Sequence, residues 1–295
     1  MGSAVTADTT AGRLRVEWDR WRATAACLGL TLLMVVALVW LGDRSQHTLL
    51  GQQLDQAGMD IVSGDAGTTR RLVGILGNVS LGSIAVAVTL LIVVAAVRDR
   101  WTAAAAAVTL VVGANLTTQL IKLFSERTDH GYLTVTSFPS GHATVVVSLV
   151  LAALLVAPGR TRTSVSMLGS AAITVTAAAT LVASWHRPTD IVGATLVCLG
   201  WGTAVLSAWS LVRGGMPSAP PTQHRIFAVT GVVLAAAALV VIGVRPDGGW
   251  AGFLDASVVL AGVGLVAALA VTTFAQVSAP MAVGDDRPEG APTGT

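Results

Sequence analysis

The stretch Phe138-Pro139-Ser140-Gly141-His142 opens directly into an aliphatic run that continues to Val156. Pro139 and Gly141 interrupt whatever structure precedes them, and Ser140 stands where a helix N-cap is expected. The run that follows is apolar and long enough to enter a membrane. This stretch therefore predicts a polar turn followed by a membrane helix, and the rest of the chain is organised around it.

The first turn of that helix has two features of an anion site. Free N–H groups and the positive end of the helix dipole coincide there, which favours phosphate and other anions. His142 lies in the same turn and exchanges a proton near neutral pH. Taken alone, these residues fit an ordinary turn before a transmembrane helix as well as they fit phosphate chemistry on a membrane-bound substrate. The other polar clusters of the chain must decide between the two.

The composition is that of a polytopic membrane protein. Of the 295 residues, 53% are hydrophobic and only 12% are charged, and the mean hydropathy is +0.72. A soluble domain carries about 25% charged residues. The net charge of +2 is small and scattered, which argues against a nucleic-acid partner. The membrane is therefore the partner that the composition indicates, and the oligomeric state stays open.

A bilayer-spanning helix needs about 20 mostly apolar residues. Runs that satisfy this requirement lie near 23–42, 72–97, 101–124, 142–158, 164–186, 189–212, 226–244 and 255–279. We therefore expect an all-α polytopic membrane helix bundle. Its predicted parts are a cytoplasmic N-terminal tail (1–22), a six-span core (23–212), a Gly- and Pro-rich linker (213–225), a two-helix C-terminal membrane extension (226–279) and a disordered tail (280–295).

Basic residues in the short loops predict the orientation. Four arginines precede the first span, and counting the N-terminus as cytoplasmic places ten basic residues of these segments inside and seven outside. The loop from Gly42 to Arg71 then lies outside, and within it Leu49 to Val62 is expected as a short helix on the membrane surface. A multi-pass protein of the plasma membrane is the expectation.

Three polar clusters interrupt the predicted core. Lys122 and Arg127 end the third span, Ser140-Gly141-His142 opens the fourth, and His186-Arg187-Pro188-Thr189-Asp190 separates the fifth from the sixth. The end of an odd-numbered span and the start of the next lie on one face of the membrane. The hydropathy pattern alone therefore predicts that all three clusters meet at one surface, which is the extracytoplasmic one.

The third cluster has a chemical logic of its own. Pro188 suits the first position of a helix, and Asp190 falls in the first turn, where a negative charge is favoured. His186 and Asp190 are four residues apart, so the carboxylate can reach back to the imidazole. Such a carboxylate fixes the tautomer and makes the other ring nitrogen a better nucleophile or base. The alternative is an exposed histidine beside a capping aspartate.

With these clusters, the chain resembles the type 2 phosphatidic acid phosphatase superfamily, the integral-membrane lipid phosphate phosphatases. The family has three motifs: Lys with six residues to Arg-Pro, then Pro-Ser-Gly-His, then Ser-Arg with five residues to His and three more to Asp. Pro139 to His142 matches the second motif fully, His186 and Asp190 match the end of the third, and Lys122 matches the start of the first. The resemblance covers about residues 80 to 210.

Two positions depart from the family pattern. The first-motif arginine would fall at Asp129, whereas Arg127 comes two residues earlier and is assigned the role of binding phosphate. The third-motif Ser-Arg would fall at Ala179-Thr180, so that arginine is absent. Arg187, next to the expected nucleophile, either replaces it or contacts phospholipid headgroups.

The resemblance implies a phosphatase that forms a phosphohistidine on His186, with Asp190 orienting that ring and His142 protonating the leaving group. It implies that substrate phosphate is held by Lys122, Arg127, Ser140 and Gly141, with neither a cofactor nor a metal. Arg187 is assigned the same role as a replacement for the absent arginine. The expected substrate is a lipid phosphate monoester or diphosphate, either polyprenyl (di)phosphate or phosphatidic acid-like. A phosphotransferase with the same site and a catalytically weak lipid-phosphate-binding scaffold or transport component are the alternatives.

Overall fold

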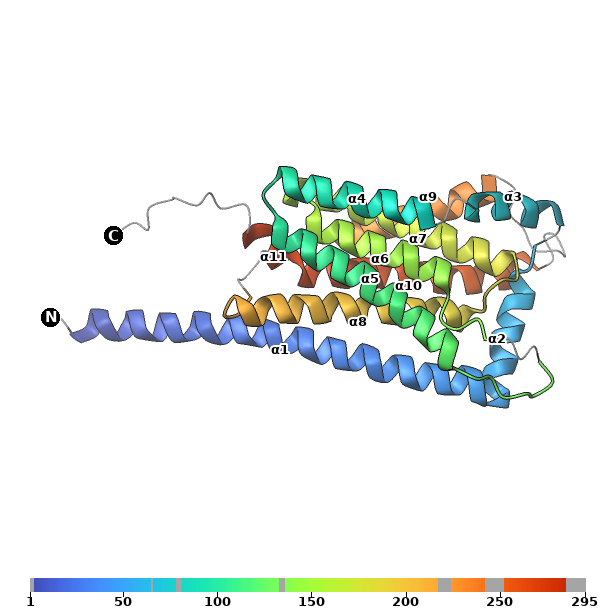
Figure 1. The fold of residues 1–295 in the computed structure, drawn as a ribbon, viewed down its shortest axis with the longest axis horizontal. Coiled ribbons are helices and arrows are strands. Elements are labelled where there is room, and N and C mark those ends of the chain that lie inside the picture. The colour runs from blue at the N-terminus through green and yellow to red at the C-terminus, as the bar shows by residue number, and fades with distance from the viewer. Residues whose placement is uncertain are drawn as a thin grey trace.

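The computed structural model describes residues 3–64, 66–77, 81–132, 136–216, 224–241 and 252–284. Within these ranges the chain is all-α (Figure 1), as predicted. The α-helices are α1 (Ser3–His47), α2 (Leu49–Val62), α3 (Ala66–Leu76), α4 (Leu81–Val97), α5 (Trp101–Phe124), α6 (Gly141–Val156), α7 (Arg162–Val182), α8 (Pro188–Val212), α9 (His224–Val241), α10 (Phe253–Val277) and α11 (Ala279–Gly284), with one 3-10 turn at Gly159–Thr161.

The long helices run along one axis of the molecule and alternate in direction (Figure 1). We call the end at which α5 and α7 finish and α6 and α8 begin the site end, and the opposite one the far end. Helix α2 crosses the site end, whereas α1 begins and α11 lies at the far end. This alternation brings the three polar clusters of the sequence to the site end, as the span count predicts.

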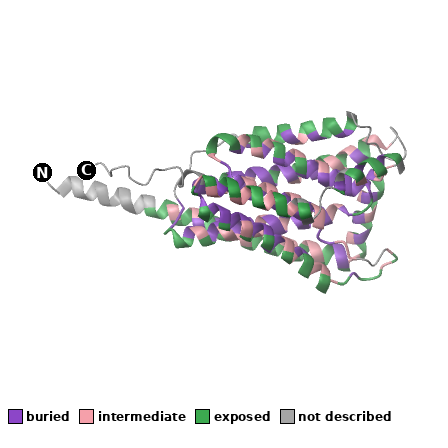
Figure 2. Cartoon of the chain, turned by 45° about the horizontal axis from the view of Figure 1, so that its top comes forward, coloured by how far each residue is buried: buried purple, intermediate pink, exposed green. Residues whose placement is uncertain are grey.

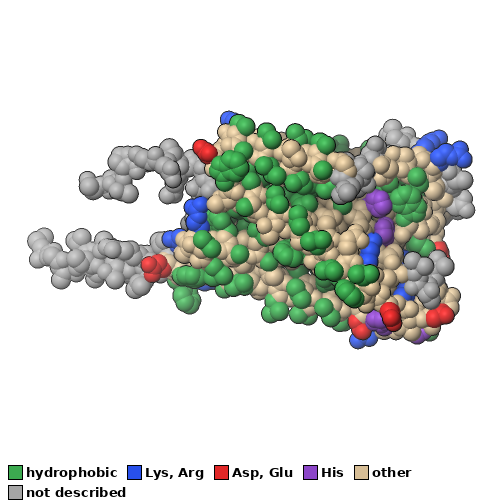
Figure 3. Space-filling view, viewed as in Figure 1, with side chains coloured by type: hydrophobic (Ala, Val, Ile, Leu, Met, Phe, Trp, Pro, Cys, Tyr) green, Lys and Arg blue, Asp and Glu red, His purple; other side chains and the backbone are tan. Residues whose placement is uncertain are grey.

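Five helices are long and apolar enough to cross a membrane, and three shorter apolar helices accompany them within the described residues. Large apolar side chains are exposed along the outside of the bundle, including Leu32, Val86 and Leu116. Figure 2 shows this exposed exterior around a buried interior, and in Figure 3 the charged side chains gather near the two ends. Exposed apolar surface of this extent requires a lipid environment. The protein is therefore a multi-pass membrane protein.

The eight apolar runs of the sequence correspond to these helices with one correction. The run 72–97 is not one helix, because α3 ends at Leu76 and α4 begins at Leu81. Gly77 lies in a turn after α3, and its N–H donates to the carbonyl of Val73. Glycine is a weak helix former, which is consistent with an end at this point. The sequence pattern missed the break because both sides of it are apolar.

The predicted C-terminal extension packs into the same core as the six-span part. Helix α9 lies along α7, and α10 packs against α7, α8 and α9. Phe274 of α10 is fully buried against Gly202 of α8, where a Cβ would collide with its ring. The predicted boundary at 213–225 between the six-span core and the C-terminal extension stays a prediction. Residues 217–223 of that linker lie outside the described part of the chain.

The predicted tail also needs a correction at its start. Residues Ala279–Gly284 form α11 rather than continuing as a disordered segment, and Met281 is fully buried. The carbonyl of Met281 accepts from Nη2 of Arg100 at 3.1 Å. A buried apolar side chain and a carbonyl bonded to a buried guanidinium explain why the chain is ordered beyond residue 280. Residues 285–295 lie outside the described ranges.

Candidate active site

The turn before α6 is built as the sequence predicts. Ser140 is the N-cap, and its Oγ accepts from the N–H of Ala143 at 3.3 Å. Its own N–H donates to the carbonyl of Asp190 at 2.9 Å, which ties this turn to the start of α8. Ser140 is fully buried, and both of these hydrogen-bond partners are protein backbone groups. Its role as a phosphate ligand stays a prediction.

Phe138 fixes the same turn from the other side. Its ring lies against Gly193 of α8, where any Cβ would collide with it, and close to Gly42 of α1. The ring is almost fully buried. Helix α6 therefore begins in a defined place relative to α8, with the amides of Gly141 and His142 in its first turn. Both residues line a cavity, so the predicted anion-binding helix start faces open space.

The predicted pair of His186 and Asp190 is present. Nδ1 of His186 lies 3.3 Å from Oδ2 of Asp190. The same carboxylate oxygen accepts from the N–H of Arg187 at 2.9 Å and from Oγ of Ser137 at 2.6 Å. An ionised carboxylate only accepts hydrogen bonds, so it selects the tautomer of the neutral His186 ring that has its proton on Nδ1 and a free lone pair on Nε2. That is the state a nucleophilic imidazole requires.

His142 and Lys122 lie beside this pair. The ring centroids of His142 and His186 are 6.1 Å apart, and His142 also lies 5.5 Å from the ring of Trp185. A Cβ on Gly141 would come within 3.5 Å of Nζ of Lys122, so that ammonium group sits at the start of α6. All three predicted clusters therefore contribute a side chain to one place, although these side chains come from the end of α5, the start of α6 and the turn before α8.

Arg127 lies in the loop after α5 and is only 7% exposed. None of its three guanidinium nitrogens has a hydrogen-bond partner among the described residues. Burial lowers the pKa of Arg127 from its usual value, and the charge of Arg187 lowers it further, while Asp55 and Asp190 act in the opposite direction. A buried cation without an acceptor is costly unless an anion arrives from outside the protein. This favours the assignment of Arg127 to phosphate.

Arg187 reaches the site through a residue that the sequence analysis missed. Its Nη1 donates to Oγ of Ser137 at 3.0 Å, and Ser137 in turn donates to Asp190. Arg187 is buried, and its Nε has no partner in the described part of the chain. Thr180, at the position of the absent family arginine, is fully buried, and its carbonyl accepts from the N–H groups of Trp185 and His186.

Helix α2 contributes two further polar side chains that the sequence analysis did not select. Asp55 is 3% exposed and accepts from the N–H and Oγ1 of Thr189 at 3.2 and 2.5 Å. Gln52 is fully buried and donates to the carbonyl of Thr128, next to Arg127, at 2.8 Å. Burial raises the pKa of Asp55 to about 6 despite these bonds to Thr189. The only local signal was polar residues on the face of α2 that packs on the bundle.

A cavity of about 800 Å³ leads away from the two histidines. One end is polar and contains Lys122, Gly141, His142 and His186. From there it follows α4, α5 and α6 towards the middle of the bundle. Its wall is mostly apolar, with a few polar side chains, and consists of Ile84, Ala85, Val88, Thr89, Val111, Val112, Asn115, Leu116, Gln119 and Val145. The shape suits a ligand with an anionic head and a hydrocarbon chain.

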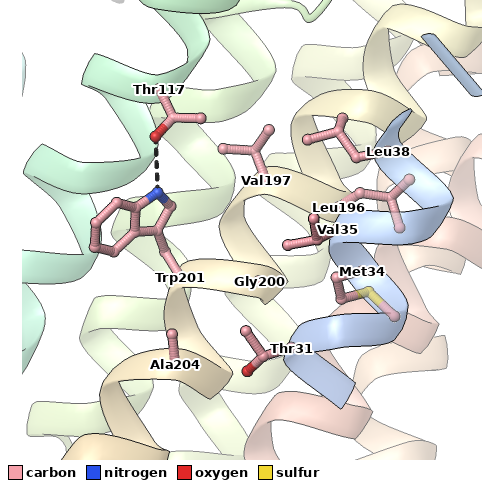
Figure 4. Close-up of a pocket in the computed structure, with 10 residues that line it drawn as sticks. All are labelled: Thr31, Met34, Val35, Leu38, Thr117, Leu196, Val197, Gly200, Trp201 and Ala204. Atoms are coloured by element: carbon pink, nitrogen blue, oxygen red, sulfur yellow. Dashed lines mark hydrogen bonds between the residues drawn. The ribbon is translucent and has the colours of Figure 1, made fainter. Parts of the chain in front are cut away.

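A second hollow of about 270 Å³ lies between α1, α5 and α8 (Figure 4). It contains no titratable side chain, and the indole of Trp201 on its wall donates to Thr117 at 2.9 Å. Chemistry on a phosphate needs cations and a base. Of these two cavities, the one of about 800 Å³ has such side chains and is therefore the candidate reaction site.

Comparison with known proteins agrees with the motifs. Residues 114–213 match the family model of the PAP2 superfamily. This range runs from the middle of α5 to the end of α8 and includes every predicted site residue. The match covers 100 of the 295 residues, and members of that superfamily are phosphatases that act on phosphate esters. No curated protein and no solved structure matches the chain.

Proposed function

We propose that this protein is a membrane phosphatase that hydrolyses a lipid phosphate monoester or diphosphate. The observation that carries the proposal is the cavity of about 800 Å³, polar at the histidines and mainly apolar along α4, α5 and α6. A phosphate group held at the polar end would leave its hydrocarbon chain along the apolar wall. Polyprenyl (di)phosphates and phosphatidic acid-like lipids both have this form.

The proposed reaction has two steps. Nε2 of His186 attacks phosphorus, the bond from phosphorus to the lipid oxygen breaks, and His142 donates a proton to that oxygen. Water then attacks the phosphohistidine, His142 takes a proton from it, and the bond from phosphorus to nitrogen breaks to release inorganic phosphate. Asp190 holds Nδ1 of His186 throughout and stabilises the positive charge on the ring.

Charge on the transferring phosphoryl group is stabilised by cations at the site end. Lys122 lies beside the start of α6. Within the described ranges no protein acceptor is bound by the three guanidinium nitrogens of Arg127 or by Nε of Arg187. Such preorganised donors contribute most where water is excluded. In this proposal the side chains and the first amides of α6 supply the stabilisation without a metal ion.

Phosphate release by the purified protein in detergent tests this function. The panel contains a phosphatidic acid, a polyprenyl phosphate, a polyprenyl diphosphate and a water-soluble phosphate ester, all with a chelator present. Turnover of at least one lipid substrate well above that of the soluble ester supports the proposal. Equal turnover of the soluble ester would contradict the proposal that the substrate is a lipid. No turnover at all, with binding of lipid phosphate retained, would favour the weak binding protein instead.

We also infer that the site faces the extracytoplasmic side of the plasma membrane. The arginines before the first span lie at the far end, and the rule for basic loops assigns that end to the cytoplasm. Both native cysteines are buried, so an introduced one can be labelled selectively. Glu126→Cys at the site end should react with an impermeant thiol reagent in intact cells, whereas Arg160→Cys at the far end should react only after lysis. The reverse pattern contradicts the orientation.

A further inference from the structure

Helix α2 lies across the site end and is joined to two of the loops that carry site residues (Figure 1). Its amide side chain at Gln52 and its carboxylate at Asp55 are three residues apart, so they lie on one face of the helix, one turn apart. Both point into the bundle, whereas their neighbours Gln53 and Leu54 are exposed. Buried polar side chains in proteins are hydrogen-bonded, so the partners of these two show what α2 is attached to.

Gln52 holds the loop that carries Arg127. Its Nε2 donates to the carbonyl of Thr128 at 2.8 Å and to the carbonyl of Gln46 at 2.9 Å. The N–H of Thr128 also donates to the carbonyl of Gln46, at 3.1 Å. One amide group therefore bridges the end of α1 and the residue next to Arg127. This fixes the backbone on which the unpartnered guanidinium is carried.

Asp55 holds the loop that carries His186. Its Oδ1 accepts from the N–H of Thr189, which is one of the first-turn amides of α8 that have no partner within that helix. Its Oδ2 accepts from Oγ1 of the same residue. The helix start is thus capped from a different helix, and the capped residue lies directly before Asp190, the partner of His186.

The end of α2 also contacts the other side of the His186 loop. The N–H of Gly64 donates to the carbonyl of Val182 at 3.1 Å, and Oγ of Ser63 lies 2.9 Å from Oγ of Ser184. Gly58 packs on Pro188 so closely that a Cβ would come within 2.9 Å of the proline ring. The segment from Val182 to Thr189 is therefore held by α2 on both sides of His186.

We propose that α2 is a positioning element for phosphoryl transfer, in which Gln52 sets the Arg127 loop and Asp55 sets the His186 loop. This inference rests on the proposed function for its kinetic part. Neither residue needs to touch the substrate. Their effect is to keep the cation and the nucleophile at a fixed separation, since displacement of a reacting group by about 1 Å can cost about 10²-fold in rate.

Amide hydrogen exchange tests the positioning without requiring turnover. Asp55→Ala should raise exchange in residues 183–190 by about fivefold and leave 125–132 unchanged, because one hydrogen bond contributes about 1 kcal/mol to protection. Gln52→Ala should do the reverse. The matched controls are Asp60→Ala and Gln53→Ala, which remove the same chemical groups from the exposed face of α2. Equal loosening of both loops by either variant, or by a control, would overturn the two-point arrangement.

Kinetics then separates the two contacts. Asp55→Ala should lower kcat about 10- to 100-fold with KM within about threefold, because the nucleophile is displaced. Gln52→Ala should act mainly on KM, because the phosphate-binding arginine is displaced. Thr189→Val combined with Asp55→Ala should add little further loss, since both remove the same contact. If Asp55→Ala and Gln52→Ala both had the kcat and KM of the wild type, the proposal would be overturned. If the wild type had no phosphatase activity but each variant still raised amide hydrogen exchange only in its own loop, only the phosphatase function would be rejected.

Discussion

Buried arginines occur at both ends of the bundle, and their surroundings are opposite. At the far end, Arg100 is 1% exposed and Arg162 is 3% exposed. Nη1 of Arg100 donates to the carbonyl of Val156 at 2.8 Å, and Nη2 of Arg162 donates to the carbonyl of Ala275 and to Oγ of Ser278 at 2.8 and 2.7 Å. At the site end, all three guanidinium nitrogens of Arg127 lack a partner among the described residues.

The pairing at the far end follows from helix direction. Helices α6 and α10 end at the far end, so they present unpaired carbonyls and the negative end of the dipole to Arg100 and Arg162. Helices α6 and α8 begin at or beside the site, where they present N–H groups, which cannot accept from an arginine. The Nη groups of Arg100 and Arg162 are thus satisfied by the protein, whereas Arg127 has no acceptor among the described residues and would be satisfied by an external anion. The same residue type stabilises one end and prepares the other for binding.

The largest expected effect concerns the nucleophile at the site end. His186→Ala should lower turnover by about 10⁴-fold or more, because the covalent step is lost and only binding and charge stabilisation remain. Labelled substrate followed by rapid quenching should give a phosphoenzyme in the wild type and none in this variant. A phosphoenzyme that still forms would mean that another residue attacks phosphorus.

His142→Ala provides the control for this assignment. A general acid contributes about 10²–10⁴-fold, and most where the leaving group is a poor one. The variant should therefore still form the phosphoenzyme from an activated aryl phosphate while turning over the alkyl phosphate poorly. Equal losses for both leaving groups would remove His142 from the role of proton donor.

The second prediction tests the two ends against each other. Arg127→Ala should lower kcat/KM by about 10³-fold, the upper part of the range for a lost oxyanion contact, without lowering thermal stability in detergent. Arg162→Ala should leave turnover per folded molecule within about twofold. It should cost several kcal/mol of stability, at about 1–3 kcal/mol for each buried acceptor left without a donor.

Binding of inorganic vanadate, which resembles the transferring phosphoryl group, gives an independent measurement. It should raise the melting temperature of the wild type and of Arg162→Ala, and have little effect on Arg127→Ala, because a ligand stabilises only a protein that binds it. If vanadate stabilised Arg127→Ala as much as the wild type, the contrast between the two ends would be lost.

The third prediction concerns the absent family arginine at Thr180. Arg187→Ala should lower kcat by about 10²-fold if Arg187 supplies that charge. Ser137→Ala keeps the guanidinium but removes its Ser137 contact, so it serves as the matched variant. A contact with lipid headgroups alone is worth about 1 kcal/mol, so a change below about threefold in Arg187→Ala would assign it to the membrane surface instead.

Much of this arrangement could be predicted from the sequence because the signals are local. The N-cap at Ser140, the pair of His186 and Asp190, and helix Leu49–Val62 each depend on residues a few positions apart. The meeting of the three clusters follows from counting spans. The multi-pass all-α fold is confirmed, whereas the roles of the individual site residues stay predictions.

The residues that sequence reasoning missed act over long separations. Ser137 and Asp190 are 53 residues apart, Gln52 and Thr128 are 76 apart, and Asp55 and Thr189 are 134 apart. No spacing rule connects such positions, since each pairing depends on how helices stack at the site end. The break between α3 and α4 and the helix after Ala279 were missed for the opposite reason, because composition alone suggested continuity and disorder there.

The smallest expected effect is a pH dependence that belongs to the site end alone. Asp55 has a pKa of about 6 in the folded protein against an ordinary value of 3.8, mainly because of burial, with Asp190 adding to the shift and Arg187 opposing it. The folded state therefore holds this proton more tightly than the unfolded state does. Its stabilising effect is complete below pH 3.8 and is lost as the pH rises through about 6.

Asp55→Asn removes this titration while keeping an oxygen that accepts from the N–H of Thr189. The stability of the variant minus that of the wild type should therefore increase between pH 4 and 7 by at most about 3 kcal/mol, the free energy of a shift of about two pKa units. Thermal unfolding in detergent across that range measures it, and Asp60→Asn on the exposed face of α2 is the control. The same difference at every pH would mean that the pKa of Asp55 is equal in the folded and unfolded states, so that burial does not raise it. Asp55 would then accept from Thr189 as an ordinary carboxylate that is ionised across this range, and the contrast between the two ends would rest on the arginines alone.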